Sequence, residues 1–263
     1  MELISSLQNP GIKNIVKLAK SKERKEQNIF IIEGARELSL AIAGGYQINS
    51  VYVYPTLFSN SDYPKVLDGI PDKIKYEVTE AVFQKIAYRE NSDGLLALAT
   101  PKNHSLENLE LSEKPFIIVL EAIEKPGNLG AILRTADAAA IDAVIVCDPL
   151  ADLYNPNVIR SGVGCLFTVQ TAACSSEEAV EWLRRNRIKS YAAELHATHW
   201  YQDTDFREPS AIVMGTEADG LTHYWLENAD DRIKIPMRGI IDSLNVSVST
   251  AILTFEAMRQ RGF

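Results

Sequence analysis

Apolar runs and amphipathic stretches alternate along the second half of the chain. Residues 116–120 (FIIVL) form a continuous apolar run, which is typical of a strand that is buried on both faces. Similar patterns predict strands at 143–146, 190–193 and 211–214, and helices at 130–139, 177–187 and 246–261. Because strands and helices alternate, we expect an α/β fold with a mostly parallel sheet and helices on both faces.

The first part of the chain shows the same alternation on a smaller scale. Strands are predicted at 29–32 and 51–54, with a helix over 34–43 between them. After an apolar run at 95–99 the periodicity is lost, and the chain stays polar until Pro115. These patterns predict a small α/β domain over 1–105, a linker over 106–114 and a larger domain over 115–263.

An amphipathic helix with a cationic side is predicted from Ile12 onward. Apolar residues recur there at helical spacing, while a second stripe carries Lys13, Lys17, Lys20 and Arg24. A solvated outer face is the more common role of such a stripe, and on the helix alone we favour it. The alternative is contact with a nucleic-acid backbone, which needs closely spaced cations but no particular bases.

Charge is distributed unevenly between the two parts of this 263-residue chain. The net charge is −8 overall, but it is +1 over residues 1–105 and −9 over residues 106–263. An acidic protein therefore still offers a local anion-binding face in its first part.

The cysteines and the hydropathy pattern indicate the class of protein. Cys147, Cys165 and Cys174 are odd in number and lack CxxC pairing, which argues against a disulfide framework or a zinc cluster. No stretch has the roughly 18 uncharged residues of a spanning helix, and the N-terminus lacks the apolar run of a signal peptide. We expect a reduced, cytoplasmic protein without a membrane anchor.

The first of three candidate loops lies between a predicted strand and the helix that follows it. Pro126 and Gly127 favour a tight turn, and Asn128 is suited to capping the free amides of the helix start. Arg134 lies about one helical turn inside the predicted helix, where a guanidinium would hold a phosphate through two hydrogen bonds. For the turn alone, an ordinary capped turn with a surface arginine is the better interpretation.

The other two loops lie near the C-terminus. Residues 214–221 (MGTEADGL) follow a predicted strand but lack the Gly-Lys-Ser/Thr ending of a P-loop, and no GxGxxG motif follows a strand. ATP hydrolysis and a Rossmann cofactor are therefore unsupported. The third loop combines residues 235–237 (IPM) with residues 243–249 (SLNVSVS), where Ser243 or Asn245 is placed to cap the last helix.

Taken together, the three loops resemble the signature set of the SpoU or TrmH family of RNA 2′-O-ribose methyltransferases, within the knotted SPOUT superfamily. The resemblance extends over the whole chain, because residues 5–54 are similar to the family's N-terminal substrate-binding domain and 155–167 to a further family segment. Ala140 departs from the pattern, since the family commonly has glycine there. The resemblance implies a trefoil knot at the C-terminus and a homodimer formed through the catalytic domain.

The resemblance also implies roles for individual residues. The RNA-facing, catalytic side of the site would contain Asn128, Arg134, Glu217, Ser243 and Asn245. The methyl donor, S-adenosylmethionine, would be held by the main chain around Leu195, Gly215, Ile235, Met237 and Leu244. RNA contacts would come from Lys13, Lys17, Lys20, Arg24, Lys25 and Arg36.

The predicted reaction is methylation of a ribose 2′-hydroxyl, with ribosomal RNA favoured as substrate by analogy. Two alternatives stay open: methylation of transfer RNA, and a non-catalytic RNA-binding or ribosome-assembly factor that has kept the fold. His196 and His199 form an HxxH pair, but such a pair is thin evidence for a metal site. We therefore predict ordinary polar packing for this pair and no metal.

Overall fold

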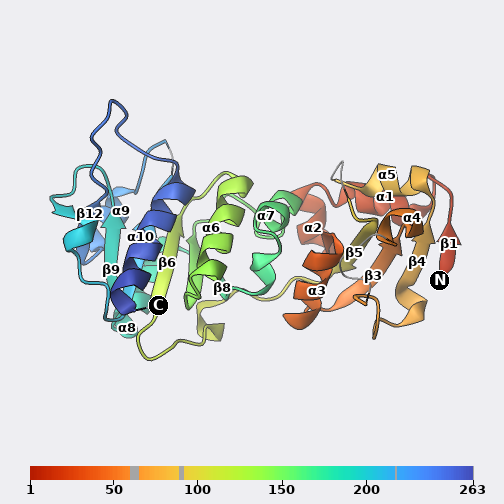
Figure 1. Cartoon of the computed structure of the whole chain (residues 1–263), viewed down its shortest axis with the longest axis horizontal. Helices are drawn as coiled ribbons and strands as arrows, with labels where there is room; N and C mark the ends of the chain where they lie inside the picture. The colour runs from red at the N-terminus through yellow and green to blue at the C-terminus, as the bar shows by residue number, and fades with distance from the viewer. Residues whose placement is uncertain (60–64, 89–91, 217, 263) are drawn as a thin grey trace. The chain divides into compact units, whose positions relative to one another are not determined.

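The computed structural model describes residues 1–59, 65–88, 92–216 and 218–262. They form two compact units (Figure 1). Unit 1 contains residues 1–103 and 152–168, and unit 2 contains residues 104–151 and 169–263.

Unit 1 is a small α/β module. Its described residues form a five-stranded sheet in the order β1-β4-β3-β5-β2, in which β5 runs antiparallel to both of its neighbours. The strands are β1 (Glu2–Ile4), β2 (Phe30–Glu33), β3 (Ile48–Val53), β4 (Lys75–Val78) and β5 (Leu95–Ala99). The helices are α1 (Pro10–Lys17), α2 (Ser21–Gln27), α3 (Ala35–Ala43), α4 (Pro55–Phe58), α5 (Glu80–Ile86) and α7 (Pro156–Ser161), with short 3₁₀ turns η1 (Asp72–Ile74) and η3 (Cys165–Phe167).

The single cationic helix predicted from Ile12 is in fact two helices. α1 ends at Lys17 and α2 begins at Ser21. Lys20 between them has extended backbone dihedrals (φ −88°, ψ 132°), which end the helical geometry. The cationic stripe therefore does not continue along one helix axis.

Residues 152–168 were predicted to belong to the second domain, but they pack within unit 1. Tyr154 lies against Phe30 with ring centroids 4.3 Å apart, and Phe167 lies 5.0 Å from the ring of Tyr46. Aromatic side chains of this size bury much apolar surface, which fixes the segment to this core rather than to the one nearest in sequence.

The predicted linker also differs from the observed structure. It contains the 3₁₀ turn η2 (Leu106–Asn108), and Leu106 is buried in the core of unit 2. Leu109 and Leu111 pack against the same core. These three leucines pack residues 106–111 against the core of unit 2, although the segment is otherwise polar. This part of the predicted linker therefore belongs to unit 2.

Unit 2 is a seven-stranded sheet in its described part, with the order β10-β12-β9-β11-β6-β7-β8 and every neighbouring pair parallel. The strands are β6 (Phe116–Glu121), β7 (Ala143–Cys147), β8 (Thr171–Cys174), β9 (Lys189–Ala193), β10 (His199–Trp200), β11 (Ser210–Met214) and β12 (Asp231–Lys234). The helices are α6 (Pro126–Ala138), α8 (Ser176–Arg185), α9 (His223–Asn228) and α10 (Val246–Arg261), with a 3₁₀ turn η4 (Tyr201–Asp203).

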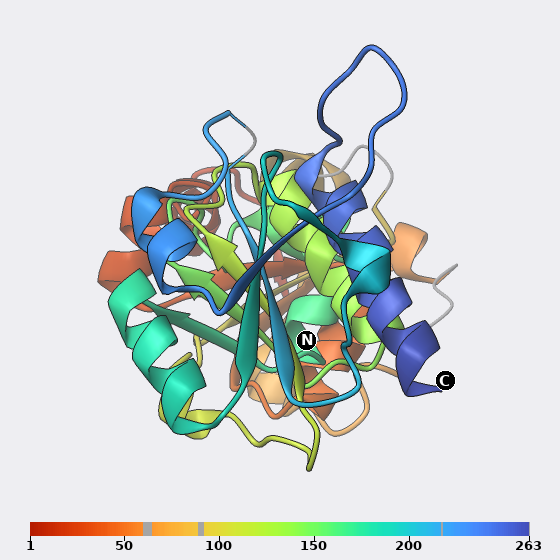
Figure 2. The same cartoon turned by 90° about the vertical axis from the view of Figure 1, so that its left-hand side faces the viewer.

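The two layers of helices confirm the predicted fold class. α6 and α10 pack against each other on one face of the sheet, and α8 and α9 cover the other (Figures 1 and 2). The central strands β6, β7 and β11 are buried along their whole length, as their apolar sequences require. The knot stays a prediction.

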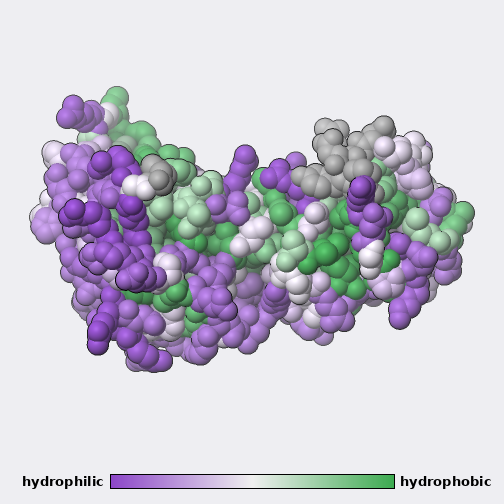
Figure 3. Space-filling model, turned by 60° about the horizontal axis from the view of Figure 1, so that its bottom comes forward, coloured by the Kyte–Doolittle hydropathy of each residue, from purple (hydrophilic) through white to green (hydrophobic). Residues whose placement is uncertain are grey.

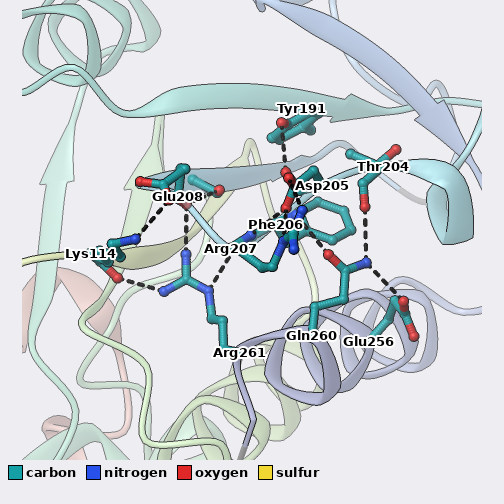
Figure 4. Close-up of polar contacts among 11 residues, drawn as sticks. Lys114, Tyr191, Thr204, Asp205, Phe206, Arg207, Glu208, Glu256, Gln260 and Arg261 are labelled. Carbon is teal, nitrogen blue, oxygen red and sulfur yellow. Dashed lines mark hydrogen bonds and ion pairs between the residues drawn. The ribbon is translucent and has the colours of Figure 1, made fainter.

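The C-terminal end of α10 is fixed to the amino-terminal edge of this sheet (Figure 4). Nε of Arg261 donates to the carbonyl of Phe206 at 2.8 Å, and Nη2 donates to the carbonyl of Glu208 at 2.8 Å. Gln260 accepts from the backbone N–H of Phe206 and donates to the carbonyl of Thr204. Burial in this cluster lowers the pKa of Arg261.

No helix in the described part of the chain is long and apolar enough to cross a membrane. On the face shown in Figure 3, hydrophilic side chains cover much of the surface, with smaller apolar patches between them.

Candidate active site

A cavity of about 490 Å³ opens at the carboxyl ends of three neighbouring strands of unit 2. Its lining comes from segments that follow β9, β11 and β12, and from the first turns of α10. In open parallel sheets, ligands bind outside the carboxyl ends of the strands, because the loops there are free to vary. A volume of this size suits a small-molecule ligand.

All five residues that the sequence analysis assigned to the methyl donor line this cavity. They are Leu195, Gly215, Ile235, Met237 and Leu244. They come from three separate loops, and Figure 2 shows the last of these, between β12 and α10, projecting beyond the strand ends. Apolar side chains on several sides and polar groups at the rim give the cavity a mixed character.

Gly215 is required by the geometry of its loop. A Cβ atom built there would lie 2.1 Å from the carbonyl carbon of Gly220 and 2.3 Å from the nitrogen of Leu221. The loop is closed at its base by Thr216, whose N–H donates to the carbonyl of Gly220 at 2.9 Å and whose carbonyl accepts from the N–H of Gly220 at 3.2 Å. Only glycine permits so close an approach of two backbone segments.

Two of the predicted catalytic residues meet at the start of the two packed helices. Nδ2 of Asn245 donates to Oδ1 of Asn128 at 3.3 Å. Asn245 is also the N-cap of α10, because its Oδ1 accepts from the backbone N–H of Ser247 at 3.0 Å. Of the two capping candidates, Asn245 rather than Ser243 caps the last helix, and the same Asn245 side chain contacts the first motif.

Asn128 itself does not cap a helix, contrary to the prediction. α6 begins at Pro126 with Lys125 as N-cap, and Asn128 lies within its first turn. Proline is favoured at the first helical position, so the helix starts before Asn128 and leaves its side chain free to bind Asn245.

Of the remaining predicted catalytic residues, Ser243 is the one found among the described residues that line the cavity. Ser243 lines the cavity, and its hydroxyl donates to Asp242 at 3.0 Å. Arg134 lies on α6 with an exposed side chain, and it has no hydrogen bond or ion pair to any described residue. Glu217 lies outside the described residues.

Sequence reasoning missed several polar groups of the cavity. Glu194, Asp219, Asp242 and Ser249 all line it. Asp219 and Ser249 lie inside the second and third candidate loops, Asp242 lies just before the third, and Glu194 follows a predicted strand, but the sequence did not single them out. Glu194, Asp219 and Asp242 favour positively charged groups, whereas Lys234, which also lines the cavity, favours negatively charged ones.

His196 and His199 have different surroundings in the structure. Nδ1 of His199 lies 3.0 Å from a carboxylate oxygen of Asp231, whereas His196 lines the cavity. Within the described ranges, no group of three His, Cys, Asp or Glu side chains is placed to hold a metal ion. Polar packing accounts for His199.

Five of the six residues predicted to contact RNA are exposed on unit 1, namely Lys13, Lys17, Lys20, Lys25 and Arg36. Arg24 is the exception and corrects the prediction. Its side chain is 3% exposed, pairs with Asp152 at 2.7 Å and donates to the carbonyls of Leu18 and Ala19. With its donors used inside unit 1, Arg24 is not available to a phosphate.

The cavity fits S-adenosylmethionine in size and in chemistry. Leu195, Ile235 and Leu244 provide apolar surface for an adenine ring, and the nearby acidic groups suit the cationic parts of the molecule. The backbone segments pack closely at Gly215, which lines the cavity. Backbone amide and carbonyl groups of this loop are therefore near enough to the cavity to bind a ligand. The donor would supply an electrophilic methyl group on a sulfonium.

Comparison with known proteins supports this assignment. Residues 115–255 match the SpoU rRNA Methylase family, and residues 9–97 match the MRM3-like substrate binding domain. A 23S rRNA (guanosine(2553)-2′-O)-methyltransferase of Bacillus subtilis, RlmP, is 29% identical over 97% of this chain and 98% of its own.

Two solved structures resemble this chain throughout. An RNA 2′-O ribose methyltransferase has a TM-score of 0.86 and 41% identity, covering 98% of this chain and 99% of its own. An AdoMet-bound rRNA methyltransferase from Sinorhizobium meliloti has a TM-score of 0.87 and 29% identity, covering 98% and 97%. Since the family match spans more than half of the sequence, the chain belongs to the SpoU rRNA Methylase family.

Proposed function

We propose that the protein transfers a methyl group from S-adenosylmethionine to the 2′-hydroxyl of a ribose in ribosomal RNA. One observation carries the proposal: Ser243 and Leu244 line the donor cavity, and the next residue, Asn245, is hydrogen-bonded to Asn128 of the first motif. A donor pocket is thus joined within one residue to polar groups suited to holding an RNA ribose.

Methyl transfer of this kind is an in-line displacement, so the chain's own residues must align the ribose and help remove its proton. We assign Arg134 to clamping the adjacent phosphate, because its exposed guanidinium has no partner among the described residues and presents paired N–H donors that match a phosphate. Asn128, Ser243 and Asn245 would orient the ribose by hydrogen bonds. Glu217 would orient Asn128 or Arg134.

Transfer of isotopic label tests the proposal. We would incubate the protein with methyl-labelled S-adenosylmethionine and separate pools of unmodified ribosomal and transfer RNA, and then identify the labelled nucleotide. Label on one ribose 2′-oxygen of ribosomal RNA is the expected result. Label only on transfer RNA would correct the substrate, and failure to bind the donor at all would favour a non-catalytic RNA-binding factor.

Arg134 variants test the assigned clamp. Arg134→Ala should lower the rate at saturating donor by roughly 100-fold or more, because a charged contact made at the reacting group is lost. Arg134→Lys keeps the charge but not the two-pronged geometry, and should recover only part of the rate. Equal turnover of Arg134→Ala and wild type, with donor and RNA bound, would refute the clamp.

We further propose that unit 1 binds the RNA backbone through the exposed Lys13, Lys17, Lys20, Lys25 and Arg36. The double variant Lys13→Gln/Lys17→Gln should then weaken RNA binding and reduce the salt dependence by roughly 0.7 to 0.9 log units per log unit of salt for each lost phosphate contact. Lys189→Gln, an exposed cation of unit 2, is the control. A salt slope unchanged in the double variant would return these lysines to the role of a solvated face.

The remaining proposals concern assembly and location. Val248 (46% exposed) and Phe255 (41% exposed) leave apolar surface on α10, and Ile240 and Ile241 do so on the preceding loop. We propose that a second copy covers this surface and completes the site. Light scattering should give twice the chain mass, and a monomer at assay concentrations would rule this out. Because the proposed substrate is ribosomal RNA, we also propose that the protein acts in the cytoplasm.

A further inference from the structure

Glu121 is a buried carboxylate that the proposed chemistry does not use. It is the last residue of β6, is 3% exposed, and has no ion pair with a cation among the described residues. Burying a carboxylate without a positive partner is costly, so its hydrogen bonds must compensate. Glu121 is not part of the cavity lining.

Both carboxylate oxygens of Glu121 bind a single residue, Thr222. Oε2 accepts from the backbone N–H of Thr222 at 2.8 Å, and Oε1 accepts from its hydroxyl at 2.6 Å. Thr222 is the N-cap of α9, where free amides attract negative charge. The carboxylate therefore holds one residue from two directions.

Thr222 lies directly after the loop that forms one wall of the donor cavity. That loop contributes Gly215, Thr216 and Leu221, among others, to the lining. Its base is closed by the pairing of Thr216 with Gly220, and Leu221 alone separates that base from Thr222. Whatever fixes Thr222 thereby helps to fix the wall of the cavity.

A second group of hydrogen bonds supports the same end of α9. Nε1 of the fully buried Trp225 donates to Oγ of Ser176 at 2.9 Å. The Ser176 hydroxyl donates to Asp148 at 2.6 Å and lies 3.5 Å from Oε1 of Glu121. Glu121 is therefore enclosed by groups that are themselves fixed, which limits its freedom to follow a displaced Thr222.

We propose that Glu121 is a positioning residue for donor binding, which acts through Thr222 on the described residues of the preceding loop, 215–216 and 218–221. It touches neither the donor nor the RNA. This inference rests on the proposed function in so far as the ligand of the cavity is S-adenosylmethionine.

Direct titration with S-adenosylmethionine tests the role. Glu121→Gln keeps the size of the side chain but replaces one of the two acceptors with an N–H donor, so the hydroxyl of Thr222 can no longer donate at that position and has to turn round to accept. We expect the Kd for S-adenosylmethionine to rise roughly tenfold, with kcat at saturating donor and the KM for RNA within about twofold of wild type. Glu121→Asp, which keeps both acceptors on a shorter stem, should recover part of the affinity.

Asp142→Asn is the matched control. Asp142 also accepts from two backbone amides, those of Ser112 at 2.7 Å and Phe116 at 2.8 Å, but at the amino-terminal edge of the same sheet. Asp142→Asn removes one of these two acceptors, so it should lower the free energy of unfolding without changing the Kd for S-adenosylmethionine. If both variants shift the Kd equally, or neither does, Glu121 has only a structural role and the inference fails.

A second pair of variants keeps the test decisive if Glu121→Gln does not fold. Thr222→Val removes the hydroxyl that Oε1 of Glu121 accepts from, while Thr222→Ser retains it. Only Thr222→Val should weaken donor binding, and equal affinities of the two variants would overturn the inference. Wild-type protein that does not bind S-adenosylmethionine would instead refute the proposed function, so the two failures are distinguishable.

Discussion

The two edges of the sheet in unit 2 are built for different purposes. At the amino-terminal edge, Arg261 and Gln260 of α10 occupy the carbonyls and amides of the loop before β11 (Figure 4). At the carboxyl edge lies the cavity, where the lining residue Leu195 is 51% exposed. At the amino-terminal edge, backbone polar groups are hydrogen-bonded within the protein. At the carboxyl edge, an open cavity is available to a ligand.

The same two helices serve both edges. α6 and α10 begin at the carboxyl edge with Asn128 and Asn245, and α10 ends at the amino edge with Arg261. A helix that is anchored firmly at one end holds its other end in place without filling the ligand site there. Substitutions at the carboxyl edge should therefore change binding, and substitutions at the amino edge should change stability.

The strongest test of this difference is Gly215→Ala. Its Cβ would lie 2.1 Å from the carbonyl carbon of Gly220, and the loop cannot relax without breaking the pairing of Thr216 with Gly220. We expect the Kd for S-adenosylmethionine to rise about 100-fold, which corresponds to about 2.7 kcal/mol. Isothermal titration measures this directly.

Gly239→Ala is the control for that variant. Gly239 lies in the loop between β12 and α10, and a Cβ atom there would have no atom within 4 Å. Donor affinity should remain at the wild-type value. If Gly215→Ala binds the donor as well as Gly239→Ala does, the loop around Gly215 does not shape the donor site.

At the amino edge, Arg261→Met should lower stability by about 2 kcal/mol, because several backbone carbonyls lose a charged donor. The rate per folded molecule should not change well below the melting temperature. All three tryptophans (Trp182, Trp200 and Trp225) lie in unit 2, so urea unfolding followed by tryptophan fluorescence reports on this unit.

A neighbouring arginine provides the comparison for Arg261. Arg207 lies in the same cluster, but it is exposed and pairs with Asp205 at 2.8 Å (Figure 4). Arg207→Met should leave the urea midpoint close to that of wild type, since exposed ion pairs contribute little. Equal destabilisation by the two substitutions would mean that the Arg261 hydrogen bonds do not anchor α10.

The sequence was sufficient for the central strands and for the cavity loops, for a physical reason. Strands such as β6 and β11 are buried on both faces and therefore consist of apolar runs. Such runs predict a strand without any knowledge of its neighbours. The strand β12 (Asp231–Lys234) was missed, because only Ile233 is buried and its other residues are polar. The donor-lining residues came from the family resemblance, since no local pattern distinguishes them.

Contacts between distant residues were beyond sequence reasoning. Arg24 looked like its neighbouring lysines, but its partner Asp152 is 128 residues further along the chain. For the same reason, the packing of Tyr154 against Phe30 placed residues 152–168 in unit 1 against expectation. A hydrophobic period of 3.6 residues in a helix, or of 2 in a strand, indicates which face is buried. It does not indicate which other element packs against that face.

The smallest expected effect concerns the end of α6 that lies opposite the site. Ala140, at a position where the family commonly has glycine, adopts the left-handed conformation with φ 49° just after the helix. Glycine is favoured at such a position because it has no Cβ to clash with the backbone. Ala140→Gly should therefore stabilise unit 2 by about 0.5 to 1 kcal/mol, measured by urea unfolding, with donor affinity unchanged.

Ala138→Gly, two residues earlier, makes the opposite prediction with the same chemical change. Ala138 is the last residue of α6 and is exposed, so glycine there only adds flexibility to the unfolded chain and should destabilise by roughly 0.5 to 1 kcal/mol. Opposite signs for the two variants would show that the backbone conformation at residue 140, rather than loss of a methyl group, sets the effect. If both substitutions destabilised unit 2, the backbone at Ala140 would not be strained, and relieving its conformation could not stabilise the amino-terminal edge of the sheet.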